Sequence, residues 1–406
     1  MPGVAASLQN WGQFRFNIFS WSPAIILISL LQCSVKESLA VHGSIAPSIV
    51  CLMLHLCIDP TFAPKIFSQG FADAFREIGV DADIVSLGSA RMSEFWAKQK
   101  WMRSKARTAA TIWNTFFEFP KSAAHISKGD IAIVYETNSI VSRVADAKFH
   151  REAKAKGAKI VSLLPDYWPC AHPFVKEAFR LRAELADAVA CVTPQLACGI
   201  GEIVKNKPVI VLEEPIDTGA FVDVARIPGH PQGPIVVWSG PPHKAESEIS
   251  AMLSAMKALP SSPPFRLRVV TGSSCPRFKI DRPFEWRPFF GLSYGEQFSD
   301  AEIAFACYGH REWDKYKGNY KVKTYMAAGC ATVTDDSGYN RNLVRHGESG
   351  FLVPDSRAMA ASIVQLIQDP EKRLHLRRAA QNACRSRFGY KPCAMNWAGT
   401  LQKIGL

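Results

Sequence analysis

From Ile49 onward, short apolar runs rich in β-branched residues alternate with segments whose apolar residues recur at helical spacing. In residues 67–78, for example, apolar side chains share one helix face until Gly79 ends the pattern. Strands that alternate with amphipathic helices are typical of βαβ units, whose strands form parallel sheets. The first series predicts strands at 49–58, 82–87, 131–136, 159–164, 188–193 and 208–212.

A second series follows an aperiodic stretch rich in proline and glycine, residues 224–234, which we interpret as a linker. Its strands are predicted at 235–240, 267–272, 284–286, 302–307, 330–334 and 350–353. A chain of 406 residues is also too long for one hydrophobic core, because cores stop growing at roughly 250 to 300 residues. The sequence therefore predicts an α/β protein with two doubly wound, Rossmann-like domains that face a cleft.

We place the N-terminal domain at residues 49–223 and the C-terminal domain at 235–387, followed by a closing helix within 388–406. Open parallel sheets bind ligands beyond the carboxyl ends of their strands, where the strand order reverses. Two opposed domains can each hold one of two reactants. This organisation favours a transfer reaction between a nucleotide-bearing donor and a second molecule.

The first 48 residues precede this pattern. Residues 17–33 form a nearly uncharged apolar run behind Arg15, interrupted by Pro23 and shorter than the ~20 residues that span a bilayer. Three interpretations stay open: a disordered or mis-annotated extension, a membrane-associating helix, and a signal sequence. We expect no catalytic residue there.

Charge and cysteine content narrow the class of partner. The chain has 48 Lys and Arg against 36 Asp and Glu, and 48 − 36 gives a net charge of +12. This excess favours an acidic partner, such as nucleic acid, an anionic membrane or a phosphate-bearing substrate.

The 11 cysteines are scattered without metal-ligand spacing, so we predict no zinc site and no disulfide framework. Such cysteine usage is typical of a protein in the reducing cytosol.

The densest signal lies in residues 321–353. It predicts a helix that ends at Gly329, a buried strand, a loop at 337–338 that opens a second helix, and a turn into a final strand. Helix N-termini attract anions because their free N–H groups carry partial positive charge, so both helix starts could cradle a diphosphate. Lys321 and Lys323 add positive charge to the first of them.

This segment resembles the C-terminal half of the retaining GT-B glycosyltransferases commonly called family 4. The residues in register with the family pattern are Met326, Ala327, Ala328, Gly329, Val333, Gly338, Gly347, Gly350, Leu352 and Val353. The resemblance is specific over residues 300–390 and weaker over 50–300. It implies sugar transfer from a nucleotide-sugar donor with retention of configuration, and neither a metal nor another cofactor. The donor-binding candidates are Gly240, Lys244, Lys321, Lys323, Tyr325, Ser337, Gly338, Tyr339 and Asn340.

The chain departs from the family at acidic positions. The family usually carries two glutamates eight positions apart, where this sequence has Tyr316 and Thr324, and Asn342 replaces a third. The loop after the strand 235–240 retains Lys244 but has proline in place of the family arginine. These departures support a rival hypothesis, a catalytically inactive GT-B domain that binds a saccharide or a partner protein.

Catalytic candidates on the acceptor side follow the N-terminal strands. Asp166 and His172 come after the fourth strand and could polarise donor or acceptor hydroxyls, or they could cap a turn and the next helix. Glu136, at the end of the third strand, is either an acceptor contact or a solvated strand terminus.

The loop 309–320 follows the strand 302–307, in the position that carries the first family glutamate. Glu312 and Asp314 could replace the missing carboxylates, and Arg311 or Lys317 the missing arginine, as donor or acceptor contacts. The alternative is a charged surface loop.

Residues 91–128 interleave lysine and arginine with tryptophan and phenylalanine. Such a segment docks an enzyme on an anionic membrane, where lipid-linked acceptors are found, or it places the aromatic residues in the core and the lysines in solvent. We expect no nucleic-acid partner, because no RNP, helix-turn-helix or zinc signature accompanies the charge.

We therefore expect a glycosyltransferase of polysaccharide biosynthesis, cytoplasmic or peripheral on the inner face of the membrane, with a glycan, lipid-linked or protein acceptor. A nucleotide-sugar epimerase of the same build is disfavoured, because the acidic and histidine constellation that it requires is missing. Two helical positions apart, Lys321 and Lys323 point ~200° from one another. We expect Lys321 at the diphosphate and Lys323 in solvent or at the domain surface.

Overall fold

The computed structural model of the protein describes residues 53–58, 68–87, 119–135, 140–165, 173–226, 232–259, 263–272, 275, 277–289, 293–298, 300–308 and 312–406. The N-terminal extension and most of the basic, aromatic segment lie outside these residues. So do the candidates Glu136, Asp166, His172 and Arg311, and the side chain of Glu312, which therefore stay predictions.

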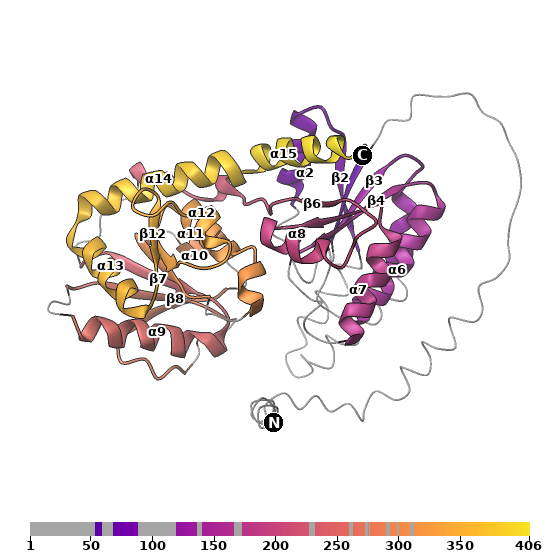
Figure 1. Ribbon diagram of the computed structural model, residues 1–406. Helices are drawn as coiled ribbons and strands as arrows, with labels where there is room; N and C mark the ends of the chain where they lie inside the picture. Colours follow the sequence, from indigo (N-terminus) through magenta and orange to yellow (C-terminus); the bar gives the residue numbers. More distant parts are fainter. Residues whose placement is uncertain are drawn as a thin grey trace, which may run out of the picture. The chain divides into compact units, whose positions relative to one another are not determined.

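Six parallel strands form the first sheet in the order β2-β1-β3-β4-β5-β6 (Figure 1). The strands are β1 (Leu54–Ile58), β2 (Ala82–Ser86), β3 (Ile131–Tyr135), β4 (Lys159–Leu164), β5 (Ala188–Cys191) and β6 (Val209–Val211). The helices between them are α2 (Gln69–Glu77), α5 (Phe119–Ser122), the 3-10 turn η5 (Ala123–His125), α6 (Ile140–Ala155), α7 (Pro173–Leu185) and α8 (Pro194–Gly201). The strand order reverses between β1 and β3, as in a doubly wound domain.

Alternate side chains of the first sheet enter different cores. Leu56 and Ile133 pack with Phe71 of α2 on one face, whereas Val134 packs with Phe149 of α6 on the other. Strands buried on both faces read as continuous apolar runs. The strands of the first sheet were therefore recognisable from the sequence.

The second sheet is also six-stranded and parallel, in the order β12-β11-β10-β7-β8-β9. Its strands are β7 (Ile235–Ser239), β8 (Arg266–Val270), β9 (Phe284–Arg287), β10 (Ile303–Ala306), β11 (Ala331–Asp335) and β12 (Gly350–Val353). Its helices are α9 (Pro242–Lys257), α10 (Tyr294–Phe298), the 3-10 turn η8 (Glu312–Tyr316), α11 (Tyr320–Ala327), α12 (Asn340–Leu343) and α13 (Ser356–Gln368). Here the strand order reverses between β7 and β10.

Both faces of the second sheet are covered by helices. Val236 and Trp238 of β7 pack with α9 and α13, whereas Ile235 and Val237 enter the core beneath α11 and α14 (Pro370–Phe388). The two predicted Rossmann-like sheets are therefore confirmed.

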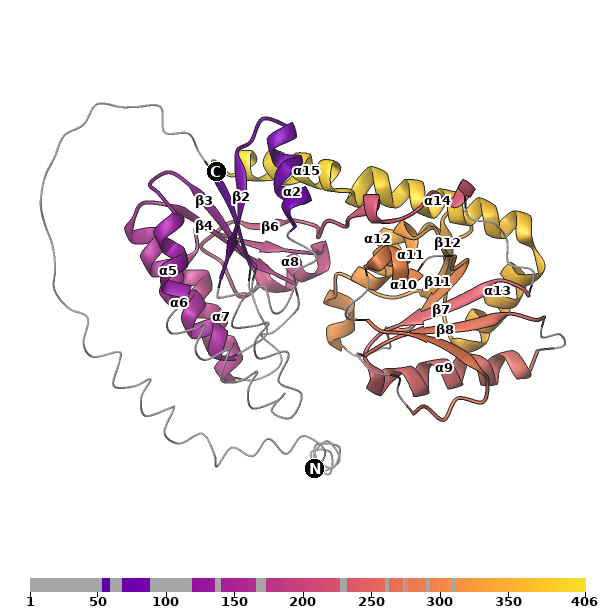
Figure 2. The ribbon, with the colours of Figure 1, turned by 180° about the vertical axis from the view of Figure 1, so that it is seen from behind.

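The last helix returns to the first domain. α15 (Tyr390–Lys403) lies beside α2 in both views (Figures 1 and 2). Trp397 of α15 is fully buried in the first core, with its ring centroid 5.2 Å from that of Phe71. The segment after residue 388 therefore completes the core of the N-terminal domain.

The predicted linker begins as ordered structure. After the 3-10 turn η6 (Thr218–Ala220), residues Val224–Arg226 form a second one, η7, and the buried Val224 donates its N–H to Gln381 of α14. Residues 232–234 are described as well, and residues 227–231 are not. The aperiodic composition therefore did not exclude a packed turn.

The described residues contain no helix that is both long and apolar enough to cross a membrane. Their eight cysteines are all free.

Candidate functional site

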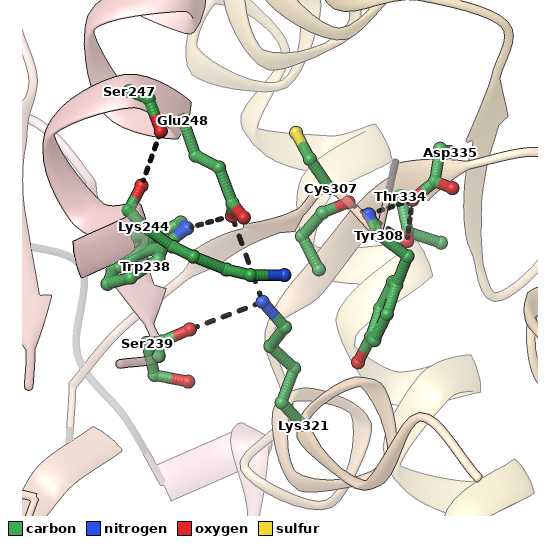
Figure 3. A network of polar contacts seen from close by, with 12 residues as sticks. Trp238, Ser239, Lys244, Ser247, Glu248, Cys307, Tyr308, Lys321, Thr334 and Asp335 are labelled. Atoms are coloured by element: carbon green, nitrogen blue, oxygen red, sulfur yellow. Dashed lines mark hydrogen bonds and ion pairs between the residues drawn. The ribbon is translucent and has the colours of Figure 1, made fainter. Parts of the chain in front are cut away.

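The candidate site lies where the strand order of the second sheet reverses, at the carboxyl ends of β7 and β10. Ser239 ends β7, Tyr308 follows β10, and Lys321 reaches toward them from the first turn of α11 (Figure 3). This is the position at which open α/β sheets bind ligands.

Lys321 is the central cation of this site. Its Nζ atom lies 3.4 Å from the Ser239 carbonyl oxygen and 3.9 Å from Oε2 of Glu248. The rings of Trp238 and Tyr308 have centroids 5.4 Å and 5.0 Å from the same nitrogen. Burial lowers the pKa of Lys321, and the neighbouring Glu248 carboxylate opposes that shift. The ammonium is thus poorly hydrated, and the Glu248 carboxylate favours its charged form.

Trp238 and Glu248 form the wall beside Lys321. The indole Nε1 of the fully buried Trp238 donates to Oε2 of Glu248 at 2.8 Å. Gly240 leaves room for this ring, since a Cβ atom there would lie 2.7 Å from Cη2 of Trp238. The predicted Gly240 therefore shapes the site through its missing side chain.

Lys244 lies in the first turn of α9, near the carboxyl end of β7. It is partly exposed, and its positive charge contributes to the lowered pKa of Lys321. The two lysines bring positive charge to the N-terminal part of a 16-residue helix, whose dipole has the same sign there.

Tyr325 supports the site from beneath. It is fully buried, and its hydroxyl oxygen accepts the N–H of Ser239 at 2.7 Å and lies 3.0 Å from the Ser239 hydroxyl. Tyr325 therefore fixes the end of β7.

The loop after β11 is organised around Asp335. Its Oδ1 accepts the Tyr308 N–H at 2.9 Å, and its Oδ2 accepts the Ser337 hydroxyl. The fully buried Asn340 donates to the Thr334 hydroxyl and to the Asp335 carbonyl oxygen. Ser337 and Asn340 thus hold the loop itself.

The second predicted helix start differs from expectation. The helix α12 has one turn, Asn340–Leu343, so it offers little of the dipole that we expected at the loop 337–338. Gly338 has a φ of +50° and approaches η8 so closely that a Cβ atom would lie 2.9 Å from the Lys315 Cα. Tyr339 is fully buried.

The expectation that Lys323 lies in solvent is wrong. Its side chain is fully buried, and its Nζ donates to the backbone oxygen of Glu214 at 3.2 Å. The same nitrogen lies 4.8 Å from the Phe388 ring centroid. Lys323 does point away from Lys321, as the ~200° separation along the helix predicts. That direction is the protein interior, because Glu214 and Phe388 cover this side of the helix.

Two of the three positions that lack the family glutamates contact the N-terminal end of α8, at its N-cap Thr193 and at Gln195. The Tyr316 carbonyl oxygen accepts the Thr193 hydroxyl at 3.2 Å, and Oδ1 of Asn342 accepts Nε2 of Gln195 at 3.0 Å. Thr324 instead bonds within its helix, to the Tyr320 carbonyl oxygen.

Sequence reasoning missed Trp238, Glu248 and Asp335. Glu248 follows Lys244 by four residues, which places both on one face of a helix that starts at the carboxyl end of a strand. That spacing could have identified Glu248.

Among the described residues, no group of three or more His, Cys, Asp and Glu side chains could hold a metal ion.

Residues 233–369 match the family described as glycosyl transferases group 1. No curated protein matches the sequence. Among similar solved structures, a glycosyltransferase from Rickettsia africae is 12% identical, with a TM-score of 0.59, over 87% of this chain and 99% of its own. Sucrose-phosphate synthase from Thermosynechococcus elongatus is 12% identical over the same shares, with a TM-score of 0.58.

HepE from Anabaena, solved in complex with UDP-glucose, is 13% identical over 87% of this chain and 100% of its own, with a TM-score of 0.57. These structures confirm the predicted GT-B fold, and the family match confirms the predicted resemblance for the C-terminal domain. The family match covers the C-terminal domain alone, within residues 233–369.

Proposed function

We propose that this protein transfers a sugar, with retention of configuration, from a nucleotide-sugar donor to a glycan, lipid-linked or protein acceptor. The donor diphosphate binds at the switch point of the second sheet. The observation that carries the proposal is the Lys321 ammonium, held between two aromatic rings beside Lys244, inside the domain that matches the group 1 glycosyl transferases.

The leaving diphosphate needs its developing charge stabilised, and preorganised cations in a partly buried site do this more strongly than water. Lys321 and Lys244 supply that charge in this proposal, without a metal or another cofactor. Neighbouring structures hold UDP or UDP-glucose, which makes uridine nucleotides the first ligands to test.

The second candidate is a binding module without catalytic activity. Thr324 and Tyr316, which stand in place of two family glutamates, favour it. Release of free nucleotide separates the two hypotheses, because only an enzyme consumes the donor.

The test is a thermal-shift titration of the full chain with the diphosphates of uridine, guanosine and adenosine and with their sugars. A ligand that binds the folded state raises Tm with the logarithm of its concentration above Kd. We expect one nucleotide family to raise Tm, and its sugar form to release nucleotide when an acceptor is added. No shift with any nucleotide at millimolar concentration would contradict the donor-site assignment.

A further inference from the structure

Glu248 places a carboxylate beside the lysine that the proposed function assigns to the donor diphosphate. Its Oε2 lies 3.9 Å from Nζ of Lys321 and accepts the Trp238 indole N–H (Figure 3). Its side chain is 14% exposed, so solvent screens its charge weakly. Any phosphate that contacts Lys321 must approach this carboxylate.

Few other charged groups of the described residues act on Lys321. The described charged groups that act on Lys321 from surrounding elements are Lys244 of α9 and Asp335 of β11, together with the Cys307 thiol after β10. Two cations therefore oppose two carboxylates around the subsite. Removing the nearer carboxylate changes that balance by a full unit of charge.

A donor and its product differ in charge at the same diphosphate. The terminal phosphate of a free nucleoside diphosphate has a second ionisation at about pH 6, which the sugar-linked phosphate lacks. At neutral pH the product therefore carries roughly one more negative charge than the donor. A fixed carboxylate beside the diphosphate repels the product more strongly than the donor.

We propose that Glu248 is a specificity-determining residue that favours the nucleotide-sugar over the free nucleoside diphosphate and so promotes product release. This inference rests on the proposed function, because it places the diphosphate at Lys321. It adds a residue that selects between two ligands of the same subsite.

Glu248→Gln is the matched substitution. It removes the negative charge but keeps the side-chain length and an oxygen that can accept the Trp238 N–H. Glu246→Gln is the control, because Glu246 lies on the same helix and is exposed. A residue with only a structural role would weaken ligand binding when altered, whereas this proposal predicts tighter binding.

The experiment measures Kd by calorimetry for pyrophosphate, UDP, UDP-glucose and uridine with the full chain and both variants. We expect Glu248→Gln to bind pyrophosphate and UDP about tenfold more tightly, UDP-glucose with a smaller gain, and uridine unchanged. Glu246→Gln should leave all four constants unchanged.

Equal gains for UDP and UDP-glucose, or a loss of pyrophosphate affinity in Glu248→Gln, would overturn the inference. UDP-glucose binding by the unaltered chain would still support the proposed function in that case. Conversely, a gain for pyrophosphate without binding of any uridine nucleotide would support the charge role of Glu248 and contradict a uridine donor. Absence of all binding would overturn both.

Discussion

Two lysines of one short helix have different surroundings and different expected roles. Lys321 is partly exposed beside Ser239 and Glu248, whereas Lys323 is enclosed by Phe388 and the chain at Glu214. A partly exposed lysine can contact a ligand, whereas a fully buried lysine contributes to the stability of the fold. Substitution of each should therefore affect a different property.

Lys321→Ala should weaken binding of the nucleotide by about one to two decades, since a charge-assisted contact is worth roughly 1.5 to 3 kcal/mol. Lys323→Ala should leave nucleotide affinity nearly unchanged. It should lower the free energy of unfolding by about 3 kcal/mol, because it breaks a buried polar contact and leaves a cavity. Calorimetry and urea denaturation of both variants measure the two effects. Equal losses of affinity would indicate a diffuse positive field.

The local pattern places Lys321 at a helix start after a strand, whereas Lys244 became a candidate through the family resemblance. It could not show that Lys323 is buried, because its enclosing group, Phe388, lies far along the chain. Trp238 reads as an ordinary strand residue, and Tyr308 as the first residue after a strand. Their role as aromatic walls depends on the pairing of β7 with β10, which local sequence does not report.

At the scale of elements, strands were predictable and helix partners were not. Strands such as β4 and β12 have the predicted bounds, because a strand buried on both faces is a continuous apolar run. β1 begins at Leu54, and residues 49–52 of its predicted range lie outside the described residues. α15 was predicted as a helix, but nothing in its local pattern indicated that it packs on α2.

Trp397→Ala tests the contribution of α15 to the first core. The side chain is fully buried, packs edge-on against Phe71 and donates its indole N–H to the Glu213 carbonyl oxygen at 3.0 Å. Its removal should lower the free energy of unfolding by about 3 to 5 kcal/mol. Met395→Ala is the control on the same helix, because Met395 is 58% exposed. Urea denaturation measures both, and similar small losses would show that α15 is only loosely attached.

Among the described residues, the segment after β6 contacts both domains and the C-terminal helices. The Glu213 carboxylate forms an ion pair with Arg387, and its carbonyl oxygen accepts the Trp397 indole N–H. The Ile216 N–H donates to the Phe388 carbonyl oxygen. Glu214 reaches both domains. Its Oε1 accepts the Tyr135 hydroxyl of β3 at 2.9 Å, and its backbone oxygen accepts Lys323 of α11.

Burial raises the pKa of Glu214 above its ordinary value of 4.5, and Lys323 and the Tyr135 hydroxyl only partly oppose this. The folded protein therefore retains this proton to higher pH than the unfolded chain does. The associated stability is fully present below about pH 4.5 and is lost as pH rises through the folded-state pKa.

Glu214→Gln removes this titration and should therefore flatten the fall in unfolding free energy as pH rises from about 4.5 toward neutrality. Glu213→Gln provides the adjacent control, because its carboxylate forms an ion pair with Arg387 near the surface. Urea denaturation across that pH range gives the slopes for the three proteins. The same slope in Glu214→Gln as in the unaltered chain would mean that the carboxyl group titrates alike in the folded and unfolded states. In that case the junction between the domains would be hydrated, and the contact of Glu214 with Tyr135 would contribute little to holding it together.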